Sequence, residues 1–214
     1  MTDRPFPPGR YPAVVVGSGP GALQLTYSLR ALGVLHAVIS KDDAPGGMFR
    51  KWPIFQRMLS WTKPFAQHER GTAEYERFDW NSLLGDEPQT RAIMTEVLDG
   101  TSYFPSRPEM ERGLVAFAER AQLQVRYGCT WTATRRLDDG EFVIETSDGE
   151  YRTRFPIFAV GVSEPWLPAV LANVEGIQQY GELRPADGYR DRRIFIVGKQ
   201  NSGFEIATSG EAVA

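Results

Sequence analysis

The sequence predicts an α/β fold that combines a parallel sheet with a three-stranded antiparallel meander. The first observation is a pair of glycine-rich turns, at residues 17–22 and 198–203, each between a short apolar run and the start of a helix-like pattern. A strand, a tight turn and a helix in this order are typical of a parallel βαβ unit. The second observation is three short strand-like runs near residues 130–136, 141–146 and 150–155, separated by turns at 138–140 and 147–149. Tight turns of this kind join antiparallel neighbours.

The opening of the parallel sheet is expected within residues 13–39. Residues 13–16 are wholly apolar, which suits a strand buried on both faces. Residues 23–32 carry apolar side chains at helical spacing, and Gly33 is expected to end that helix. Residues 37–39 then form the second strand. The polar, proline-rich residues 1–12 are expected to be a loose lead-in, and they lack the apolar core of a signal peptide.

Residues 41–105 show no regular alternation of strands and helices and form an insertion. Short helices are expected near 54–60 and 89–98, because a compact domain seldom carries a bare loop of this length. The aromatic side chains of the insertion either line a dry pocket or belong to ordinary core; they are Phe49, Trp52, Phe55, Trp61, Phe65, Tyr75, Phe78 and Trp80. Its basic residues could bind a substrate carboxylate, although solvent exposure is the simpler interpretation for each; they are Arg50, Lys51, Arg57 and Lys63. His68 has the same two interpretations, a proton shuttle or surface.

The second half of the first unit begins with a helix whose start is marked in the sequence. Ser106 and Glu109 have the spacing of a capping box, and the helix is expected to end near Ala121. A strand over 123–127 and the three strands of the meander follow. Residues 155–160 return as an apolar strand, and residues 162–191, rich in proline, glycine and tyrosine, are expected to be a linker.

Composition and charge exclude several functional classes. An apolar share of 42% and a net charge of −3 are typical of a soluble globular protein without a basic surface for nucleic acid. No run of about 18 apolar residues suggests a membrane span. Cys129, the only cysteine, rules out an internal disulfide and a Cys-x-x-Cys pair, so a cytoplasmic location is expected. No spacing typical of metal ligands or of a catalytic triad is found.

The first glycine turn has the features of a dinucleotide site. Gly17 permits the tight turn, and Gly19 lets the backbone approach a pyrophosphate. Gly21 and Ala22 are expected to keep the helix close to the strand. Free N–H groups and a partial positive charge at the helix N-terminus attract the phosphates. The alternative is a turn that serves packing alone, but a strand before and an amphipathic helix after favour nucleotide binding.

One departure from the dinucleotide pattern concerns the ribose. An acidic residue usually ends the second strand and binds the ribose hydroxyls. Ser40 stands at this position here and could donate a hydrogen bond to the ribose, while Lys41 could neutralise a phosphate. Asp42 could reach the ribose instead, but is expected to face solvent.

Four segments resemble the flavin-dependent monooxygenases, the class of flavin-containing monooxygenases, Baeyer–Villiger enzymes and amino-acid N-hydroxylases. They lie in the family's order along nearly the whole chain. The first is the FAD turn at 17–22, and the second is residues 45–49, which are similar to the Gly-Gly-x-Trp segment near the flavin. The third is residues 104–110, which are similar to the helix start beside FAD. The fourth is residues 159–161 with Pro165 and Pro168, which are similar to the Ala-Thr-Gly-x-x-x-x-Pro hinge. Val160 replaces the usual threonine of the hinge.

The resemblance implies a Rossmann-like FAD-binding domain over residues 13–161 and the start of an NAD(P)-binding domain over 192–214. NADPH would reduce FAD, and O₂ would then form a C4a-(hydro)peroxyflavin that oxygenates a nitrogen, sulfur or carbon centre of a small molecule. No catalytic residue is assigned. The residues expected at FAD are Gly17, Ser18, Gly19, Pro20, Gly21, Ala22, Ser40, Lys41, Gly47, Met48, Phe49, Arg107, Trp131, Ala159, Val160 and Gly161.

The second glycine turn resembles the family's Gly-x-Gly-x-Ser-Gly site for the nicotinamide nucleotide. It consists of Gly198, Lys199, Gln200, Asn201, Ser202 and Gly203, after an expected strand at 194–197. Gln200 replaces the middle glycine and could crowd the pyrophosphate, whereas Lys199 adds a positive charge. Gly210 is expected to break the helix that follows, because glycine costs about 1 kcal/mol in a helix interior.

The second domain is expected to be incomplete, because the chain stops shortly after this turn. Its strand and helix would then lack a sheet of their own, so residues 190–214 are expected to contact another copy or a partner chain. Two alternatives to a monooxygenase remain open. One is a non-catalytic flavin-binding subunit that needs a partner. The other is a pyridine-nucleotide-dependent reductase, although the missing cysteine pair speaks against the disulfide-reducing kind.

Overall fold

The computed structural model describes residues 4–50, 57–58, 68–69, 71–162, 166–183 and 186–211. Several predictions from the sequence lie outside this range. They are the helix near 54–60 apart from residues 57 and 58, the aromatic residues Trp52, Phe55, Trp61 and Phe65, the basic residues Lys51 and Lys63, and Pro165 of the hinge. Among the described residues, no helix combines the length and the apolar character needed to cross a membrane.

A parallel sheet forms the centre of the fold, with β1 (Ala13–Val16) between β2 (His36–Ile39) and β6 (Phe155–Phe158). Val15 pairs with Val38 on one side and with Ile157 on the other. All four side chains of β1 are buried, which explains why the run is wholly apolar. The strands predicted at 13–16, 37–39 and 155–160 are therefore confirmed.

The strand predicted at 123–127 is reduced to a single bridge beside β2. Arg126 donates its backbone N–H to Val38 O at 2.9 Å and accepts from Ser40 N at 3.0 Å. The ladder does not extend further, since Tyr127 N turns back to Val125 O and Gly128 adopts a positive φ of +65°. The segment still runs parallel to β2 and leads to Cys129, which is buried.

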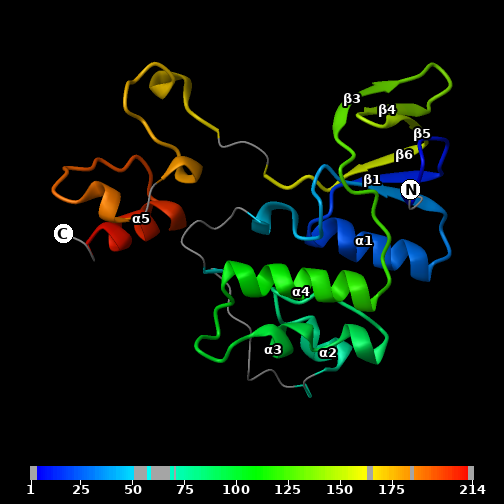
Figure 1. Cartoon of the computed structure of the whole chain (residues 1–214), viewed down its shortest axis with the longest axis horizontal. Coiled ribbons are helices and arrows are strands. Elements are labelled where there is room, and N and C mark those ends of the chain that lie inside the picture. The colour runs from blue at the N-terminus through cyan, green and yellow to red at the C-terminus, as the bar shows by residue number, and fades with distance from the viewer. Residues whose placement is uncertain are drawn as a thin grey trace.

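Helices cover one side of the sheet and the meander lies on the other. Figure 1 shows α1 (Pro20–Ala31) next to the sheet and α4 (Arg107–Arg120) below α1. Leu23 and Tyr27 of α1 pack with Leu114 and Phe117 of α4 in one apolar cluster. The capping box is confirmed, because Glu109 N donates to Ser106 Oγ at 3.3 Å and Ser106 N donates to Glu109 Oε2 at 2.6 Å.

The described part of the insertion supplies short helices, most of which contact α4. They are the 3₁₀ turns η1 (Gly47–Arg50) and η2 (Pro88–Thr90) and the α-helices α2 (Ala73–Glu76) and α3 (Ile93–Val97). The helix predicted at 89–98 is thus divided in two, because Ala92 lies in the left-handed region at φ 58°. Tyr75 is buried, whereas Phe78 and Trp80 are exposed, so these three aromatic residues do not share one pocket wall.

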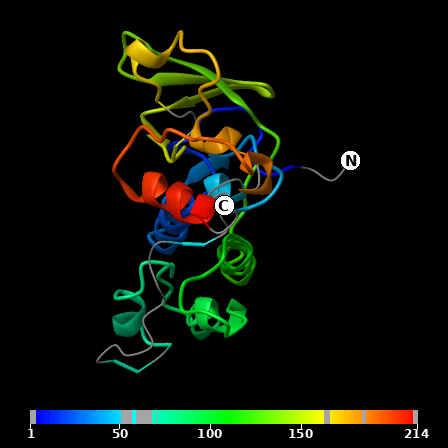
Figure 2. The same ribbon diagram turned by 90° about the vertical axis from the view of Figure 1, so that its left-hand side faces the viewer.

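The antiparallel meander has the order β3-β4-β5, as predicted. Its strands are β3 (Trp131–Arg136), β4 (Phe142–Thr146) and β5 (Gly149–Thr153), and a bulge lies between Trp131 and Ala133. Ile144 and Tyr151 pack with Val14, Val16 and Cys129 in a second apolar cluster. The meander therefore closes one face of the parallel sheet; Figure 2 shows it at the top and α2–α4 at the bottom.

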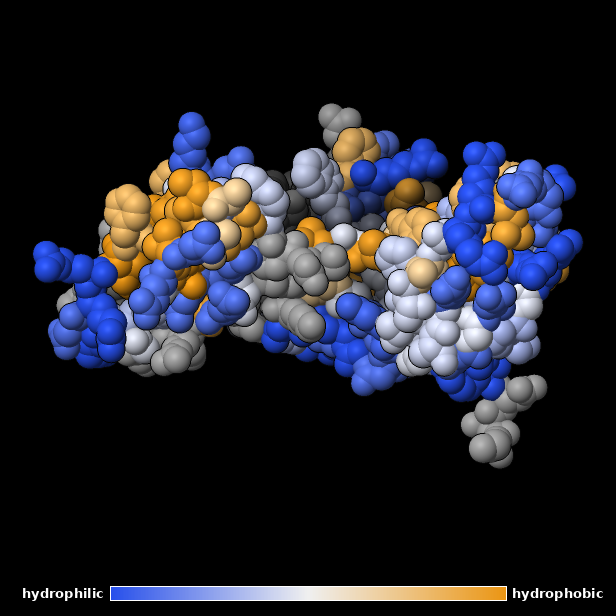
Figure 3. Space-filling view, turned by 90° about the horizontal axis from the view of Figure 1, so that it is seen from above, coloured by the Kyte–Doolittle hydropathy of each residue, from blue (hydrophilic) through white to orange (hydrophobic). Residues whose placement is uncertain are grey.

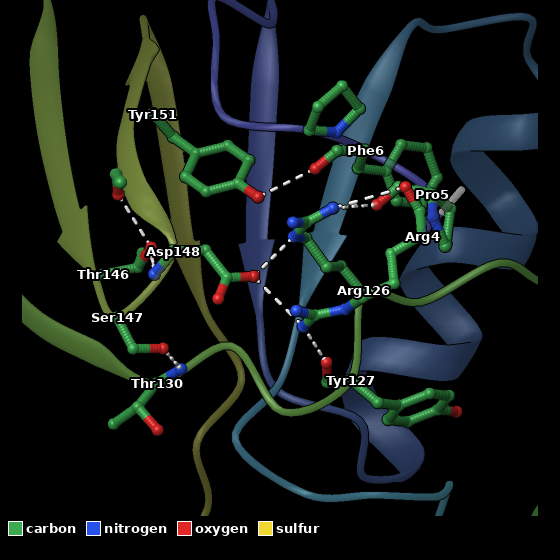
Figure 4. Close-up of polar contacts among 12 residues, drawn as sticks. Arg4, Pro5, Phe6, Arg126, Tyr127, Thr130, Thr146, Ser147, Asp148 and Tyr151 are labelled. Carbon is green, nitrogen blue, oxygen red and sulfur yellow. Dashed lines mark hydrogen bonds and ion pairs between the residues drawn. The ribbon is translucent and has the colours of Figure 1, made fainter. Parts of the chain in front are cut away.

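Residues 4–12 are bound to the body of the protein, in contrast to the loose lead-in expected from the sequence. Tyr11 N donates to Arg152 O, and Arg152 N donates to Gly9 O. Arg4 and Arg126 both contact Asp148, at 3.0 and 2.6 Å, and Arg126 also donates to the carbonyl oxygens of Arg4 and Pro5 (Figure 4). Charged and backbone groups more than 100 residues away therefore hold this segment.

The C-terminal segment differs from its prediction in two ways. Residues 194–197 form no strand, because a strand needs a hydrogen-bonded neighbour and none of the described residues supplies one. Helix α5 (Asn201–Glu211) begins at the second glycine turn as expected, but it continues through Gly210. Gly210 is the second-last residue of this helix, where the cost of a glycine is smallest. The segment stands beside the sheet-and-helix body in Figure 1.

Candidate functional site

The first glycine turn contacts the segment that follows β6. Gly17 donates its N–H to Ile39 O at 2.8 Å and has a φ of +126°. A Cβ atom at Gly17 would overlap the carbonyl oxygen of Ala159 and lie 2.9 Å from its carbonyl carbon. Ala159 N in turn donates to Val16 O at 2.9 Å. Glycine is therefore required at position 17 both for its conformation and for the close approach of residue 159.

A second glycine pair brings residues 45–49 onto the same turn. Gly46 N donates to Ser18 O at 3.0 Å, and a Cβ at Gly47 would lie 2.9 Å from Gly19 Cα. The side chain of Met48 lies against Gly161, since a Cβ there would be 3.6 Å from the Met48 sulfur. Three segments that are far apart in the sequence, 17–19, 46–48 and 159–161, thus meet at the carboxyl end of β1 and β6.

The N-terminus of α1 opens at this meeting point. Gly19 is the N-cap residue without a side-chain cap, Pro20 follows, and the first turn holds no acidic residue. Such an end presents free backbone N–H groups and a partial positive charge, as an anion site requires. Ala22 is fully buried against the sheet. The expectation for Gly21 was wrong, because a Cβ there would meet nothing within 4 Å; Ala22 alone provides the close packing.

Arg107 lies at the start of α4 and reaches the insertion. Its Nη1 donates to Arg50 O at 3.1 Å, and this bond ties α4 to η1. Its Nε is buried and has no hydrogen-bond acceptor among the described residues. A buried guanidinium N–H without an acceptor is costly, so this atom is suited to a ligand oxygen. Phe49, next in the insertion, is half-buried against the cluster around Leu23.

Ser18, Ser40 and Asp42 form a polar cluster at the end of β2. The Ser18 and Ser40 hydroxyls are 2.9 Å apart, and Asp42 Oδ2 lies 3.1 Å from Ser18 Oγ and 3.3 Å from Ser40 Oγ. The expectation that Asp42 faces solvent was therefore wrong, because both hydroxyls hold its carboxylate over the turn. Lys41 is exposed.

Tyr127 is a neighbour of this cluster that sequence reasoning missed. Burial above all, together with the charge of Asp42, raises the pKa of its phenol to about 12, and the charge of Arg50 opposes this shift. The phenol therefore stays protonated and is available as a donor beside Asp42. No signal in the sequence marks Tyr127, because it reaches the site only when the segment at 126 lies beside β2.

Trp131 and Val160, the remaining residues expected at FAD, lie beside or within the segment that ends β6 and follows it. Trp131 packs against Phe158 with ring centroids 4.8 Å apart, and its Nε1 donates to Thr134 Oγ1 at 2.9 Å. Because Phe158 directly precedes Ala159, Trp131 lies next to the segment at 159–161. Val160 is exposed.

Arg50, Arg57 and His68 are the basic residues and the histidine of the insertion that the structure describes, and each has contacts of its own. Arg50 pairs with Asp43 and Glu111, and Arg57 donates to Phe104 O. His68 is exposed and stacks on Phe78. The Arg50 side chain lies against Gly46 of the converging turns, since a Cβ at Gly46 would be 3.1 Å from Arg50 Cγ. The contacts of Arg57 and His68 lie away from these turns.

The second glycine turn lies in the C-terminal segment. Gly198 has a φ of +146°, and a Cβ at Gly203 would lie 3.2 Å from Gly198 O, so the helix starts close against the turn. The other members, Lys199, Gln200, Asn201 and Ser202, are exposed. Glu205 of α5 accepts a hydrogen bond from Tyr180 OH at 2.9 Å, which joins the helix to the linker.

Comparisons with known proteins identify relatives and solved structures that are similar to this chain. The chain is 30% identical over 203 residues to mouse FAD-dependent oxidoreductase domain-containing protein 2, which covers 90% of this chain and 29% of the relative. A flavin-containing monooxygenase from Stenotrophomonas maltophilia has a similar fold, with a TM-score of 0.68, 21% identity, and coverage of 96% of this chain and 56% of that one. The bacillithiol disulfide reductase of Staphylococcus aureus is equally similar, with a TM-score of 0.68, 18% identity, and coverage of 96% and 55%.

The chain thus spans less than a third of the mouse relative and little more than half of the two solved structures. At these identities the two structures establish the fold, a Rossmann-type flavoprotein arrangement of a parallel sheet and an antiparallel meander. The profile of one family, described as pyridine nucleotide-disulphide oxidoreductase, matches residues 14–212, from β1 to the end of α5. The chain belongs to the pyridine nucleotide-disulphide oxidoreductase family.

Proposed function

We propose that the three converging turns hold FAD and that this chain is the flavin-binding part of an oxidoreductase of the monooxygenase type. The observation that carries the proposal is the meeting of residues 17–19, 46–48 and 159–161 around the uncapped N-terminus of α1. The FAD-binding domain would comprise residues 13–161, joined by a linker over 162–191 to the start of an NADP-binding domain from residue 192.

The residues present fit this cofactor at both of its ends. Gly17 and Gly19 leave room for a pyrophosphate at the N-terminus of α1, where no acidic side chain would repel it. The buried Nε of Arg107 lacks an acceptor, and a ring oxygen or nitrogen of a flavin would supply one. Gly47, Met48 and Phe49 would then line the flavin side, with Ala159, Val160 and Gly161 opposite.

Bound FAD would supply the redox chemistry, with NADPH as the reductant and O₂ as the source of the transferred oxygen. The chain's own residues bind and orient the cofactor and exclude water from it. The substrate is then a small molecule with an oxidisable nitrogen, sulfur or carbon centre. The similar fold of a flavin-containing monooxygenase supports this choice.

A reductase is the second candidate, because the family and one similar structure carry that activity in their names. The sole cysteine, Cys129, is buried in the cluster of Val14 and Tyr151. A dithiol relay within these residues would need a second cysteine, so a disulfide-reducing reaction of that kind is disfavoured. O₂ consumption that depends on NADPH and on an added substrate would support the monooxygenase, and NADPH oxidation without O₂ would support the reductase.

Reconstitution with FAD tests the proposed FAD site, and a substitution at Arg107 tests the predicted contact of its Nε with the cofactor. We expect purified protein to show the absorbance of an oxidised flavin after FAD is added and excess is removed. Arg107→Met should weaken FAD binding about tenfold or more, because a hydrogen bond from a charged donor contributes about 1.5–3 kcal/mol. Arg112→Met is the matched control, since Arg112 lies on the same helix, is exposed and donates to Val97 O, away from the converging turns. Wild-type protein that retains no flavin would overturn the proposed function.

We further propose that residues 190–211 bury an apolar face against more protein, either a second copy or a partner chain. Ile194, Val197 and Phe204 are largely exposed, and Phe195 is 90% exposed. Figure 3 shows apolar side chains gathered on this C-terminal segment. Exposed apolar groups at this density favour association, and the unpaired backbone of 194–197 could accept a neighbouring strand.

Light scattering of the protein as it elutes from a size-exclusion column gives its molar mass and so measures this association. Phe195→Asp should shift the protein towards the monomer, because a charge would be buried in the interface. Leu32→Asp is the matched control, as Leu32 is 76% exposed at the end of α1 in the main body. Equal masses for wild type, Phe195→Asp and a chain lacking residues 190–214 would contradict the proposal.

A further inference from the structure

Ser40 occupies the position where dinucleotide folds usually carry the ribose-binding acid, but the structure leaves it no capacity for a ribose. Its side chain is buried, with only 2% of the residue exposed. The hydroxyl lies 2.9 Å from Ser18 Oγ and 3.3 Å from Asp42 Oδ2, and it accepts the N–H of Asp42 at 3.2 Å. A serine hydroxyl has one proton, which goes to Ser18 Oγ or to Asp42 Oδ2, and the N–H of Asp42 occupies one acceptor site. With only 2% of the residue exposed, the remaining lone pair is closed to a ribose.

Asp42 stands two residues further along and has the capacity that Ser40 lacks. Its Oδ2 is held by the hydroxyls of Ser18 and Ser40 at 3.1 and 3.3 Å. Its Oδ1 has no hydrogen-bond partner in the described part of the chain, and the side chain is half-buried rather than free in solvent. The carboxylate therefore has a fixed orientation and one oxygen ready to accept.

The neighbours of Asp42 make poorer candidates for the same role. Asp43 has a side chain that is 82% exposed, and it pairs with Arg50. Lys41 is exposed and carries no acceptor. Of the two carboxylates that follow β2, only that of Asp42 is hydrogen-bonded to Ser18, the residue between Gly17 and Gly19.

We propose that Asp42 is the carboxylate that accepts the ribose hydroxyls of the FAD adenosine, and that Ser18 and Ser40 are positioning residues that aim it. The inference rests on the proposed FAD site and adds a residue outside the usual position of the acid. A negative charge at this place also disfavours a 2′-phosphate, so the first turn accepts FAD or ADP and rejects a 2′-phosphorylated nucleotide.

Displacement of FAD by adenosine nucleotides tests the assignment on the full chain. The flavin fluorescence of FAD-loaded protein is titrated with ADP, 2′,3′-dideoxy-ADP and adenosine 2′,5′-bisphosphate. Wild type should bind ADP at least tenfold more tightly than the dideoxy analogue, because only ADP offers hydroxyls to Asp42. In Asp42→Asn this preference should fall to about twofold or less, and adenosine 2′,5′-bisphosphate should bind relatively better because the repelling charge is gone.

Asp43→Asn is the matched control and should keep the preference of the wild type. Asp42→Asn with an unchanged preference for ADP would overturn the assignment while leaving the FAD site intact. A wild-type protein that binds FAD but does not distinguish ADP from the dideoxy analogue would overturn it without any variant, so the test survives a variant that does not fold. Wild type that binds neither FAD nor ADP would instead overturn the proposed function itself.

Discussion

Replacing Gly17 by alanine is expected to lower the free energy of unfolding by about 3–5 kcal/mol and to abolish FAD binding. At φ +126° a residue with a Cβ is strained, and the new atom would overlap the carbonyl oxygen of Ala159. Relief would require the turn to move away from residues 159–161, which are rigidly held because Ala159 N donates to Val16 O. Urea unfolding of the apoprotein measures the loss of stability, and FAD titration measures the loss of the site.

Gly21→Ala provides the control within the same turn. A Cβ at Gly21 meets nothing within 4 Å, and the residue lies inside α1. Gly21 is the second residue of α1, where the interior preference of about 1 kcal/mol for alanine over glycine is reduced, so this variant should unfold at about the urea concentration of the wild type. If Gly17→Ala were as stable as Gly21→Ala, the close approach of Ala159 to the turn would be refuted.

Asp148→Asn is expected to cost about 2–3 kcal/mol, because it removes the shared partner of two arginines. Arg126 and Asp148 retain only 12% and 15% of their side-chain exposure, and Arg4 joins them from the lead-in (Figure 4). Without the carboxylate, Arg126 would remain largely buried and lose its counter-ion, and Arg4 would lose the ion pair that helps to hold the lead-in. Asp138→Asn is the matched control, since Asp138 lies exposed in the other turn of the meander.

The same substitution should change how stability depends on pH. Burial opposes ionisation of Asp148, but the hydrogen bond from Arg126 and the charges of Arg4 and Arg126 outweigh it and lower its pKa in the folded protein. An ionised Asp148 therefore stabilises the fold above the pKa of the unfolded chain, about 3.9, and this contribution is lost as the pH falls through the lower folded value. The difference in unfolding free energy between wild type and Asp148→Asn should shrink below about pH 4. A constant difference in unfolding free energy between wild type and Asp148→Asn down to pH 2 would contradict this account.

Local features of the fold could be predicted because they depend on residues close in the chain. The capping box needs only Ser106 and Glu109, which are three residues apart, and both hydrogen bonds are present. The meander likewise follows from its two glycine turns. At the first glycine turn, the order of strand, turn and helix is enough to predict an exposed helix N-terminus.

The site itself was only partly predictable, because its remaining contacts join distant residues. Asp42 was expected in solvent, since nothing near it in the sequence shows that Ser18 would meet it from 24 residues away. The lead-in was expected to be loose, although Arg4 has its partners at Tyr127 and Asp148. The strand predicted at 194–197 has the right residues, but a strand also requires a neighbour to pair with.

The sequence by itself therefore determined the α/β class, the two glycine turns, the meander and the family resemblance, because local backbone preferences and hydrophobic spacing encode them. Only the tertiary structure decided that Ala22 rather than Gly21 packs against the sheet, that Gly47 meets Gly19, and that Asp42 turns towards Ser18 in the glycine turn. These contacts depend on the distance between segments far apart in the chain, and that distance is set when β1, β2 and β6 pair and bring their carboxyl ends together.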